Sequence, residues 1–392
     1  MVTRIINGKI ILLKEILCGY SIYFENGKIT AITTDNLPFD KEIDACGNYV
    51  SAGFIDIHVH GGGGYDFMDG GADAIINAAN FHLKTGTTSI MPTSLACSTE
   101  VLVEFLKDLR KAQNSDKLQS TILGAHLEGP YFSQNQAGAQ NPEYITDPKP
   151  EDYEMILKDF GDIICRWSFA PERKDSEEFC EALVNAGVYP SVAHSDATYE
   201  DVKKVYDSGC KTVTHLYSGM STITRHDGYR KLGVIESAYL LDDMMVEIIA
   251  DGKHLPKELL QMIVKCKSQD KICLVTDAMR AAGTDVKESF LGRKGEEMPC
   301  IIDDAVAKLP DRTAFAGSIA TADRLVRTMV KEAELDICTA VSMMTKVPAV
   351  TFDLKGKGEL AVGSDADVVI FDDNIEIINV ISGGKEIGNQ NM

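Results

Sequence analysis

Six histidine and carboxylate side chains stand where five predicted β-strands end, an arrangement that could hold metal ions. They are His58 and His60 after one strand, and Glu128, His194, His215 and Asp277, each after another strand. Imidazole and carboxylate groups suit zinc, iron and related divalent metals. A barrel of parallel strands gathers its strand ends at one face, so these side chains would converge there. We therefore expect one or two divalent ions per chain.

His58 and His60 close an apolar run and precede four glycines. Side chains two residues apart in a strand point to the same face, so both imidazoles would face one site. Two polar residues at a strand end are the alternative interpretation, but the accompanying ligands favour metal binding. Asp56 lies on the same face, where it would either orient a ligand or close the floor of the barrel.

Glu128, His194 and His215 are each a weak indication of a metal ligand when taken alone, but together they indicate a metal site. Gly129-Pro130 follows Glu128 and ends its strand, and by itself this carboxylate would be interpreted as a solvated loop residue. Histidines at other strand ends make a metal ligand the better interpretation. His126 faces the same side as Glu128, and we interpret it as a hydrogen-bonded structural residue.

Asp277 ends the last predicted barrel strand and suits either metal binding or proton transfer. A divalent metal lowers the pKa of bound water towards ~7, and a nearby carboxylate can take the proton. Both roles fit hydrolysis, in which Asp277 would be the catalytic acid and base.

A small basic cluster, Arg225-His-Asp-Gly-Tyr-Arg-Lys231, stands out in an acidic chain. Guanidinium groups pair well with phosphate, so the cluster indicates an anion site. A solvated loop is the equally simple alternative. His254, just past the seventh predicted strand, could reach the same pocket.

Alternating strand and helix patterns would position these residues. Strands are predicted near 53–58, 88–91, 121–127, 163–169, 188–193, 211–214, 244–250 and 271–276. Helical patterns cover 72–84, 99–112, 176–186, 198–208 and 256–267. Eight such steps predict a (β/α)8 barrel in the α/β class. His82 lies on a helical face, and we interpret it as structural.

The segments outside this pattern are also informative. Residues 286–315 read as a β-ribbon insertion, followed by helices near 319–335 and 337–346. Short β-like runs occupy residues 1–50 and return at the end of the chain. Neither end has enough strands for a core, so the two are expected to pair as one small domain.

Composition restricts the classes of partner. The net charge of −20 argues against nucleic acid or an anionic membrane. No apolar run approaches the length of a membrane span, and the N-terminus has no signal-peptide core. The ten cysteines form no Cys-x-x-Cys pair, so reduced thiols and a cytoplasmic location are expected.

Several motifs together resemble the N-acetylglucosamine-6-phosphate deacetylases of the amidohydrolase superfamily, over nearly the whole chain. They are Gly53-Phe-Ile-Asp-Ile-His-Val-His-Gly61, His126-Leu-Glu-Gly-Pro130, Ala193-His194, Thr214-His-Leu-Tyr217, Ala250-Asp-Gly-Lys-His254, Thr276-Asp-Ala278 and Ala316-Gly-Ser318. The closing Gly363-Ser-Asp-Ala-Asp-Val-Val-Ile is common to many amidohydrolases. The resemblance implies a metal-dependent barrel at 53–353 and a β-sandwich made from 1–52 and 354–392, usually in a homodimer.

The family's reaction removes acetate from an N-acetylated amino-sugar phosphate. By resemblance, Glu128, His194 and His215 bind the metal common to the family, and His58 and His60 complete a second metal site. Asp277 matches the catalytic acid/base. The resemblance assigns the substrate contacts to Ala139, Gln140, Ser218, Gly219, His226, Arg230, His254, Phe315, Ala316 and Gly317.

Three departures from the family pattern concern the substrate. Gln140 stands where the family usually has a histidine that contacts the substrate amide, and Ser218 replaces a phosphate-contacting asparagine. The arginine loop also reads as longer, so Arg225 or His226 could take the place of Arg230. The metal identity, the sugar epimer and the acyl group stay open on this evidence.

Two functions other than a deacetylase are alternatives for this chain. A different amidohydrolase, such as a cyclic amidase or deaminase, is one; many cyclic amidases use a modified lysine on the fourth strand, and residues 163–171 contain none. A catalytically silent barrel that acts as a binding scaffold is the other. The intact ligand set and Asp277 argue against it.

Overall fold

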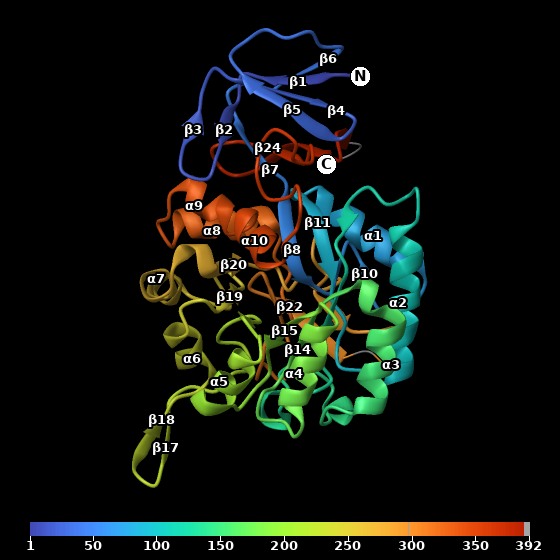
Figure 1. Ribbon diagram of the computed structural model, residues 1–392, viewed down its shortest axis with the longest axis vertical. Helices are drawn as coiled ribbons and strands as arrows, with labels where there is room; N and C mark the ends of the chain where they lie inside the picture. Colours follow the sequence, from blue (N-terminus) through green and yellow to red (C-terminus); the bar gives the residue numbers. More distant parts are fainter. Residues whose placement is uncertain (297, 388–392) are drawn as a thin grey trace.

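Eight parallel strands form the barrel that the sequence predicts, in a computed structural model that describes residues 1–296 and 298–387 (Figure 1). In order they are β8 (Phe54–Val59), β11 (Thr87–Pro92), β12 (Thr121–Ile122) with β13 (Ala125–Glu128), β14 (Ile164–Phe169), β15 (Tyr189–Val192), β16 (Thr212–Val213), β19 (Met245–Ile248) and β20 (Ile272–Leu274). Their carboxyl ends share one face of the barrel, which is where the candidate ligands stand.

The barrel has two irregular seams. The third strand breaks at Gly124, whose φ of +146° favours glycine. As a result β12 pairs with β11, while β13 pairs with β14. At the second seam β20 and β8 are bridged near the ligand end, where the Asp277 amide donates to the His58 carbonyl at 2.9 Å. This direct bond holds two candidate ligands side by side.

Helices cover the outside of the barrel (Figure 1). They are α1 (Ala72–Leu83), α2 (Thr99–Gln113), α3 (Pro150–Phe160), α4 (Ser176–Asn185), α5 (Tyr199–Asp207), α6 (Val234–Leu240), α7 (Lys257–Cys266) and α8 (Ala322–Lys331). Two short helices follow, α9 (Ile337–Ser342) and α10 (Lys346–Thr351). The sequence patterns predicted α1, α2, α4, α5 and α7 to within one residue at each end, but they did not predict α3 or α6.

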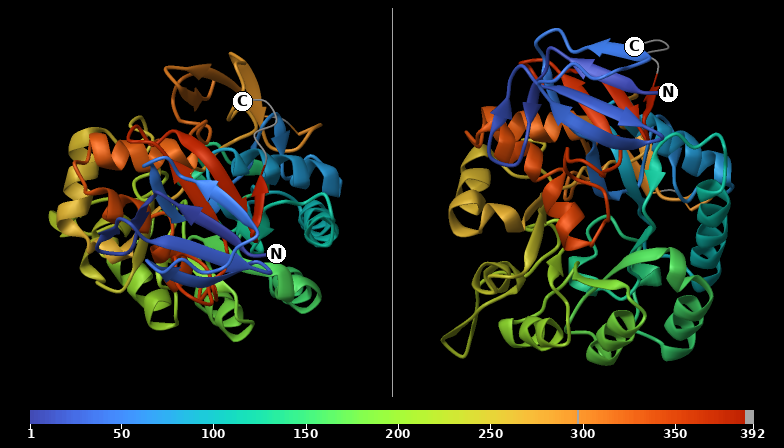
Figure 2. Two further views of the ribbon diagram at one scale, coloured as in Figure 1. Left: turned by 90° about the horizontal axis from the view of Figure 1, so that it is seen from above. Right: turned by 45° about the horizontal axis from the view of Figure 1, so that its top comes forward.

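A β-sandwich built from both chain ends lies on the barrel (Figure 2). One sheet has the order β5 (Lys28–Thr33), β4 (Ser21–Glu25), β1 (Thr3–Ile6), β6 (Lys41–Asp44). The other has the order β26 (Lys385–Ile387), β25 (Ile377–Ser382), β24 (Val368–Phe371), β7 (Tyr49–Ala52), β2 (Lys9–Ile11), β3 (Ile16–Leu17). Residues of both ends, such as Ile22 and Ile370, share one buried core. The exact domain limits at 52/53 and 353/354 stay a prediction.

Two β-insertions extend from the ligand end. The first is the hairpin of β17 (Thr224–His226) and β18 (Tyr229–Lys231), which projects from the barrel with its residues exposed (Figure 1). The second is the predicted ribbon, with β21 (Glu288–Leu291), β22 (Met298–Asp303) and β23 (Val306–Lys308). Among the residues described, no helix combines the length and apolar character that crossing a membrane requires.

Candidate metal centre and substrate pocket

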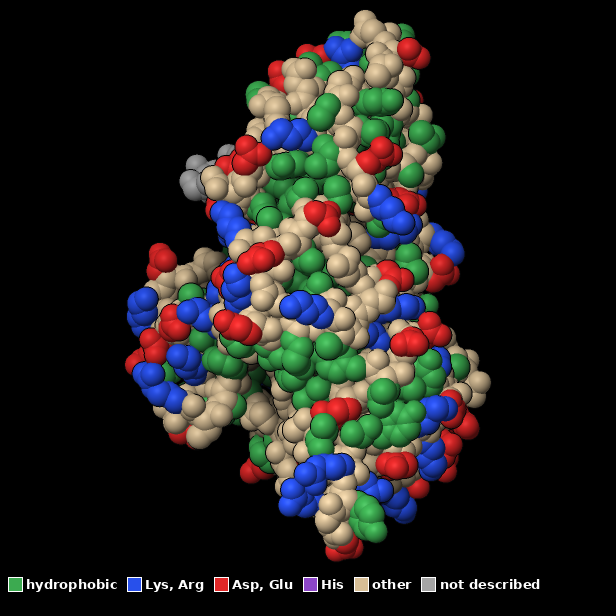
Figure 3. Space-filling model, turned by 90° about the vertical axis from the view of Figure 1, so that its left-hand side faces the viewer, with side chains coloured by type: hydrophobic (Ala, Val, Ile, Leu, Met, Phe, Trp, Pro, Cys, Tyr) green, Lys and Arg blue, Asp and Glu red, His purple; other side chains and the backbone are tan. Residues whose placement is uncertain are grey.

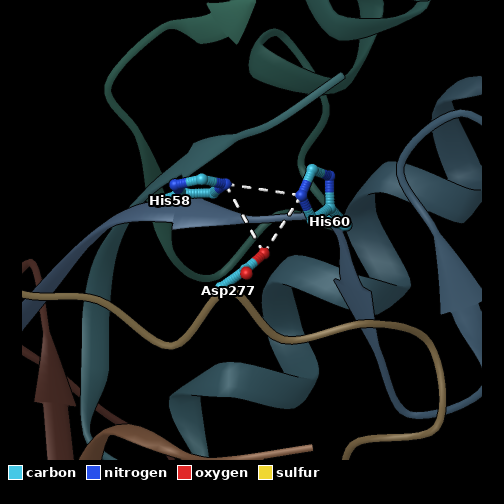
Figure 4. A group of neighbouring side chains, drawn as sticks. All are labelled: His58, His60 and Asp277. Atoms are coloured by element: carbon cyan, nitrogen blue, oxygen red, sulfur yellow. Dashed lines mark hydrogen bonds and ion pairs between the residues drawn. The ribbon is translucent and has the colours of Figure 1, made fainter. Parts of the chain in front are cut away.

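The six candidate ligands converge at the carboxyl ends of the barrel strands. His58, His60 and Asp277 point toward one another from β8 and the loop after β20 (Figure 4). The His60 Nε2 lies 3.1 Å from the Asp277 Oδ1, and the two Nε2 atoms of His58 and His60 are 3.4 Å apart. Donor atoms this close to one another, all buried, form a cluster in which an ion would be shared.

Glu128 connects this group to the other two histidines. Its Oε1 lies 3.0 Å from the His215 Nε2, 3.4 Å from the His194 Nε2 and 3.5 Å from the His58 Nε2. Its Oε2 lies 3.3 Å from the His60 Nε2. The single carboxylate therefore faces four imidazoles, each of which presents its Nε2 atom.

The backbone at three of these positions is left-handed. The φ angles of His194, His215 and Asp277 are +44°, +27° and +48°. A non-glycine residue in such a conformation costs on the order of 1–3 kcal/mol and is held by its surroundings. The sharp turn takes each chain out of the strand and directs the side chain inward.

The other ring nitrogen of two histidines has an acceptor that fixes the tautomer. The His194 Nδ1 donates to the Gln136 carbonyl at 2.7 Å, and the His58 Nδ1 lies 3.3 Å from the Glu247 Oε2. In His60 and His215 the buried Nδ1 has no hydrogen-bond partner within the described part of the chain. An Nδ1–H leaves the lone pair of Nε2 free for a metal, so the donor set fits a divalent cation.

Electrostatics in the cluster also favour a cation. Burial would lower the pKa of His58, but Glu128 and Asp277 raise it to about 10. Burial would also lower the pKa of His60, but hydrogen bonds to Asp277 and Glu128 raise it to about 9. Burial would raise the pKa of Glu128, yet the charge of His58 and bonds from His194 and His215 hold it well below its ordinary value. The carboxylates thus hold positive charge at the centre.

Sequence reasoning missed a buried ion pair beneath the cluster, Arg166 with Glu247. The Glu247 Oε2 also accepts the His215 amide at 3.2 Å, besides facing His58. Arg166, in β14, donates to Ser191 in the neighbouring strand β15 and to Thr214 at the end of β16. A buried arginine in β14 opposite an acid in β19 was the available signal, because both stand in otherwise apolar runs.

Three further polar residues, Asp56, His126 and His82, border the donor cluster and bond to residues outside it, although the His126 ring contacts that of His58 at 4.6 Å between centroids. Asp56 accepts from the Thr276 hydroxyl at 2.5 Å and the His58 amide at 3.3 Å, and burial raises its pKa to about 7. The His126 Nε2 bonds to the Ser168 hydroxyl at 2.7 Å. The His82 Nε2 donates to the Gly61 carbonyl at 3.0 Å. All three tie strand ends to their neighbours.

A pocket of about 260 Å³ opens over the cluster. Its wall includes most of the residues that sequence reasoning assigned to the substrate, namely Ala139, Gln140, Ser218, Gly219, His254, Phe315 and Gly317. His60, Glu128, His194, His215 and Asp277 form its floor. The His254 ring packs against Phe315 at 4.4 Å between centroids, and its Nδ1 lies 2.9 Å from the buried Asp251 carboxylate.

Three of the predicted substrate residues are not in the pocket wall. Ala316 is buried behind it. His226 lies in β17 and Arg230 in β18, the two paired strands of the projecting hairpin, and both residues are exposed. The pocket wall also contains Leu95, Tyr217, Leu291 and Ala314, which the sequence did not indicate.

The barrel, the two-ended sandwich and the strand-end ligands define the class of metal-dependent barrel hydrolases. Comparison with known families matches residues 49–387 to the amidohydrolase family. The chain belongs to this family and, as relatives that are 30% and 32% identical over most of its length show, to the N-acetylglucosamine-6-phosphate deacetylases within it.

Relatives of this kind align over most of the chain. The N-acetylglucosamine-6-phosphate deacetylase of Lysinibacillus sphaericus is 30% identical, over 93% of this chain and 92% of the relative. That of Haemophilus influenzae is 32% identical over 88% of each. The N-acetylgalactosamine-6-phosphate deacetylase of Escherichia coli O157:H7 is 27% identical, over 85% of this chain and 86% of the relative.

Solved structures agree with the fold. The N-acetylglucosamine-6-phosphate deacetylase of Pasteurella multocida superimposes with a TM-score of 0.92 at 27% identity, over 99% of this chain and 100% of that one. A variant of the Mycobacterium smegmatis enzyme, in complex with N-acetyl-D-glucosamine-6-phosphate, gives 0.89 at 26% identity, over 98% of each chain.

Proposed function

We propose that this protein is a metal-dependent deacetylase of amino-sugar catabolism. It hydrolyses the N-acetyl amide of N-acetylglucosamine 6-phosphate to glucosamine 6-phosphate and acetate. The observation that carries the proposal is the convergence of the histidines and carboxylates at the floor of a sugar-sized pocket. The relatives named above act, by their names, on this class of substrate.

Two groups of residues would hold the ions. Glu128, His194 and His215 would hold one, and His58 and His60 would complete a second site, with zinc or iron as the candidates. A bound divalent ion supplies a Lewis acid that polarises the amide carbonyl and lowers the pKa of water.

Asp277 is the residue that would move the proton. Its Oδ1 faces both His58 and His60, at 3.5 Å and 3.1 Å, and its side chain reaches the pocket. The low pKa that these histidines give Asp277, against the effect of burial, keeps it ionised and able to accept a proton from water. It would then pass that proton to the departing amine, which is a poor leaving group unless protonated.

The sugar would lie between the loop that carries Ala139 and Gln140 and the ribbon that carries Phe315. His254, Ser218 and Gly219 are the wall residues toward which the phosphate would extend, with Gly317 in the wall beside the sugar and Ala316 buried next to it in the chain. His254 keeps one ring nitrogen for the pocket because Asp251 occupies the other.

The hairpin supports a homodimer in which each chain completes its partner's phosphate site. Arg225, His226 and Arg230 do not line the pocket of their own chain, yet they form the cationic group that a phosphate needs. Tyr229 at the hairpin tip is 77% exposed. Figure 3 shows basic side chains gathered at the lower end, where the hairpin projects, and hydrophobic side chains on the face above it.

The remaining expectations concern location and partners. The ten cysteines are all free, in keeping with a reducing compartment such as the cytoplasm. The acidic charge makes a small phosphosugar, rather than nucleic acid or an anionic membrane, the expected partner.

Acetate release from N-acetylglucosamine 6-phosphate tests the proposal. The purified protein, loaded with zinc or iron(II), should release acetate, and chelation should abolish the activity. His194→Ala should lower both the metal content, by elemental analysis, and the turnover. N-acetylgalactosamine 6-phosphate belongs in the same assay, because Gln140 and Ser218 leave the epimer open. No release from either sugar by metal-loaded protein would contradict the proposal and favour a silent scaffold or another amide substrate.

A further inference from the structure

Gln140 is hydrogen-bonded at both ends of its side-chain amide. Its Oε1 accepts the Ala96 backbone N–H at 2.8 Å, and its Nε2 donates to the Glu128 Oε2 at 2.7 Å. The side chain is buried, with 4% of its surface exposed. Because a backbone N–H can only donate, it fixes the Gln140 oxygen on the Ala96 side and leaves the nitrogen for Glu128.

With this contact, the two oxygens of the Glu128 carboxylate have different partners. Gln140 holds Oε2, whereas Oε1 faces the Nε2 atoms of His215 and His194 at 3.0 Å and 3.4 Å. A carboxylate held at one oxygen cannot rotate freely, so the other oxygen keeps its direction. Hydrogen bonds of this kind, from residues that do not touch the metal, typically change metal affinity 10- to 100-fold.

We propose that Gln140 is a positioning residue that sets the orientation of Glu128 as a metal ligand. This inference rests on the proposed function for the identity of the site, but its mechanism is the Gln140–Glu128 contact alone. The amide connects the loop after β11, which contains Ala96, to the end of β13, where Glu128 lies. Gln140 therefore fixes the carboxylate relative to the barrel, and only one N–H of its amide remains for a substrate.

Zinc affinity of the metal-free protein measures this role without any turnover assay. Gln140→Met keeps the length of the side chain and removes both hydrogen bonds, whereas Gln140→Asn keeps an amide but withdraws it by one methylene. Competition with a chromophoric chelator should show 10- to 100-fold weaker zinc binding in both variants, at the ion that Glu128 shares with His194 and His215.

Gln134→Met is the matched control. Gln134 lies in the same loop and donates its side-chain amide to the Pro142 and Ile145 carbonyls rather than to Glu128. Its replacement by methionine should leave zinc affinity within about threefold of the native value, if only lost contacts to Glu128 matter. Melting temperatures of the metal-free proteins report any general loosening of the loop.

Native zinc affinity in either Gln140 variant would overturn the inference. An equal loss of affinity in Gln134→Met would do so too, because loop order and not the Glu128 contact would then be responsible. The outcomes are separate from those of the deacetylase assay: a native protein that binds zinc but releases no acetate contradicts the proposed substrate and leaves the Gln140 result standing.

Discussion

Single residues at the ends of the barrel strands carry the chemistry proposed for this protein. Asp277 combines a left-handed backbone, a bond to the first strand and a side chain that faces two histidines. These features turn the carboxylate toward the pocket floor. A residue so constrained should act through its chemistry more than through stabilisation of the fold.

Asp277→Asn should lower turnover by ~100-fold or more, the lower range for loss of a general acid/base, because an amide cannot take up the proton. The native shape of the side chain is kept, so the melting temperature and most of the zinc content should persist. Steady-state kinetics on N-acetylglucosamine 6-phosphate with elemental analysis would measure both. Near-native turnover would mean that another group moves the proton.

The convergence of the candidate ligands was predictable because each of them stands at the end of an apolar run, where residue type and position agree. His58, His60 and Asp277 meet as their spacing indicates. Arg166 and Glu247 each stand out as a charge in an apolar run, but their pairing crosses the barrel from β14 to β19, and no local pattern shows which residues meet. The bond from Gln140 to Glu128 was also out of reach, since it depends on the path of a loop.

Among the elements, helix α1 secures the loop that follows β8, the strand that leads to the candidate ligands His58 and His60. Its His82 is fully buried and donates to the Gly61 carbonyl, one residue after His60. Burial lowers the pKa of His82 to about 4, below its ordinary 6.5. The folded state thus keeps this ring neutral at pH values where the unfolded chain is already protonated.

The stability that neutral His82 contributes is therefore present above pH 6.5 and is lost as the pH falls toward 4. The lowered pKa corresponds to roughly 3 kcal/mol at most. In His82→Gln the amide can still donate to Gly61 but does not titrate, so its melting temperature should fall less steeply between pH 7 and 4.5. Metal-free proteins should be compared, so that metal release does not contribute. Equal slopes would show that His82 does not set the acid sensitivity.

At the scale of elements, the sequence predicts most of the strands and helices of the fold. The predictions that were wrong have local causes. Strands and helices repeat with clear periods, and five helices match closely. The third strand reads as continuous at 121–127, but Gly124 breaks it into two. Helix α6 has only seven residues, too few for a periodic pattern to show.

For the whole molecule, the hairpin of β17 and β18 predicts cooperation between two chains. Arg230→Ala should raise KM for the phosphosugar about ten- to hundred-fold, the value of a charge-assisted contact, and change KM for the unphosphorylated sugar little. If the hairpin serves the partner's pocket, a mixture of Arg230→Ala and Asp277→Asn chains should regain activity. A mixed dimer then has one site with an intact Asp277 and an intact hairpin.

The measurement is activity at low substrate concentration after the two variants exchange subunits, with each variant alone as the control. Sedimentation of the native protein gives its assembly state. A monomeric native protein, or no gain on mixing, would place the phosphate contact within one chain.

The two-ended sandwich also has a consequence for biosynthesis. Val50 in β7 pairs with Ile370 in β24, and the buried faces of β1 and β4 share their core with β24 and β25. Strand β24 lies about 320 residues after β7 in the chain. On a ribosome that adds 5–20 residues per second, β24 therefore emerges roughly 15–60 s after β7. During this interval the first strands expose apolar faces and unpaired edges, so the nascent chain is most open to chaperones, and to aggregation, at its beginning.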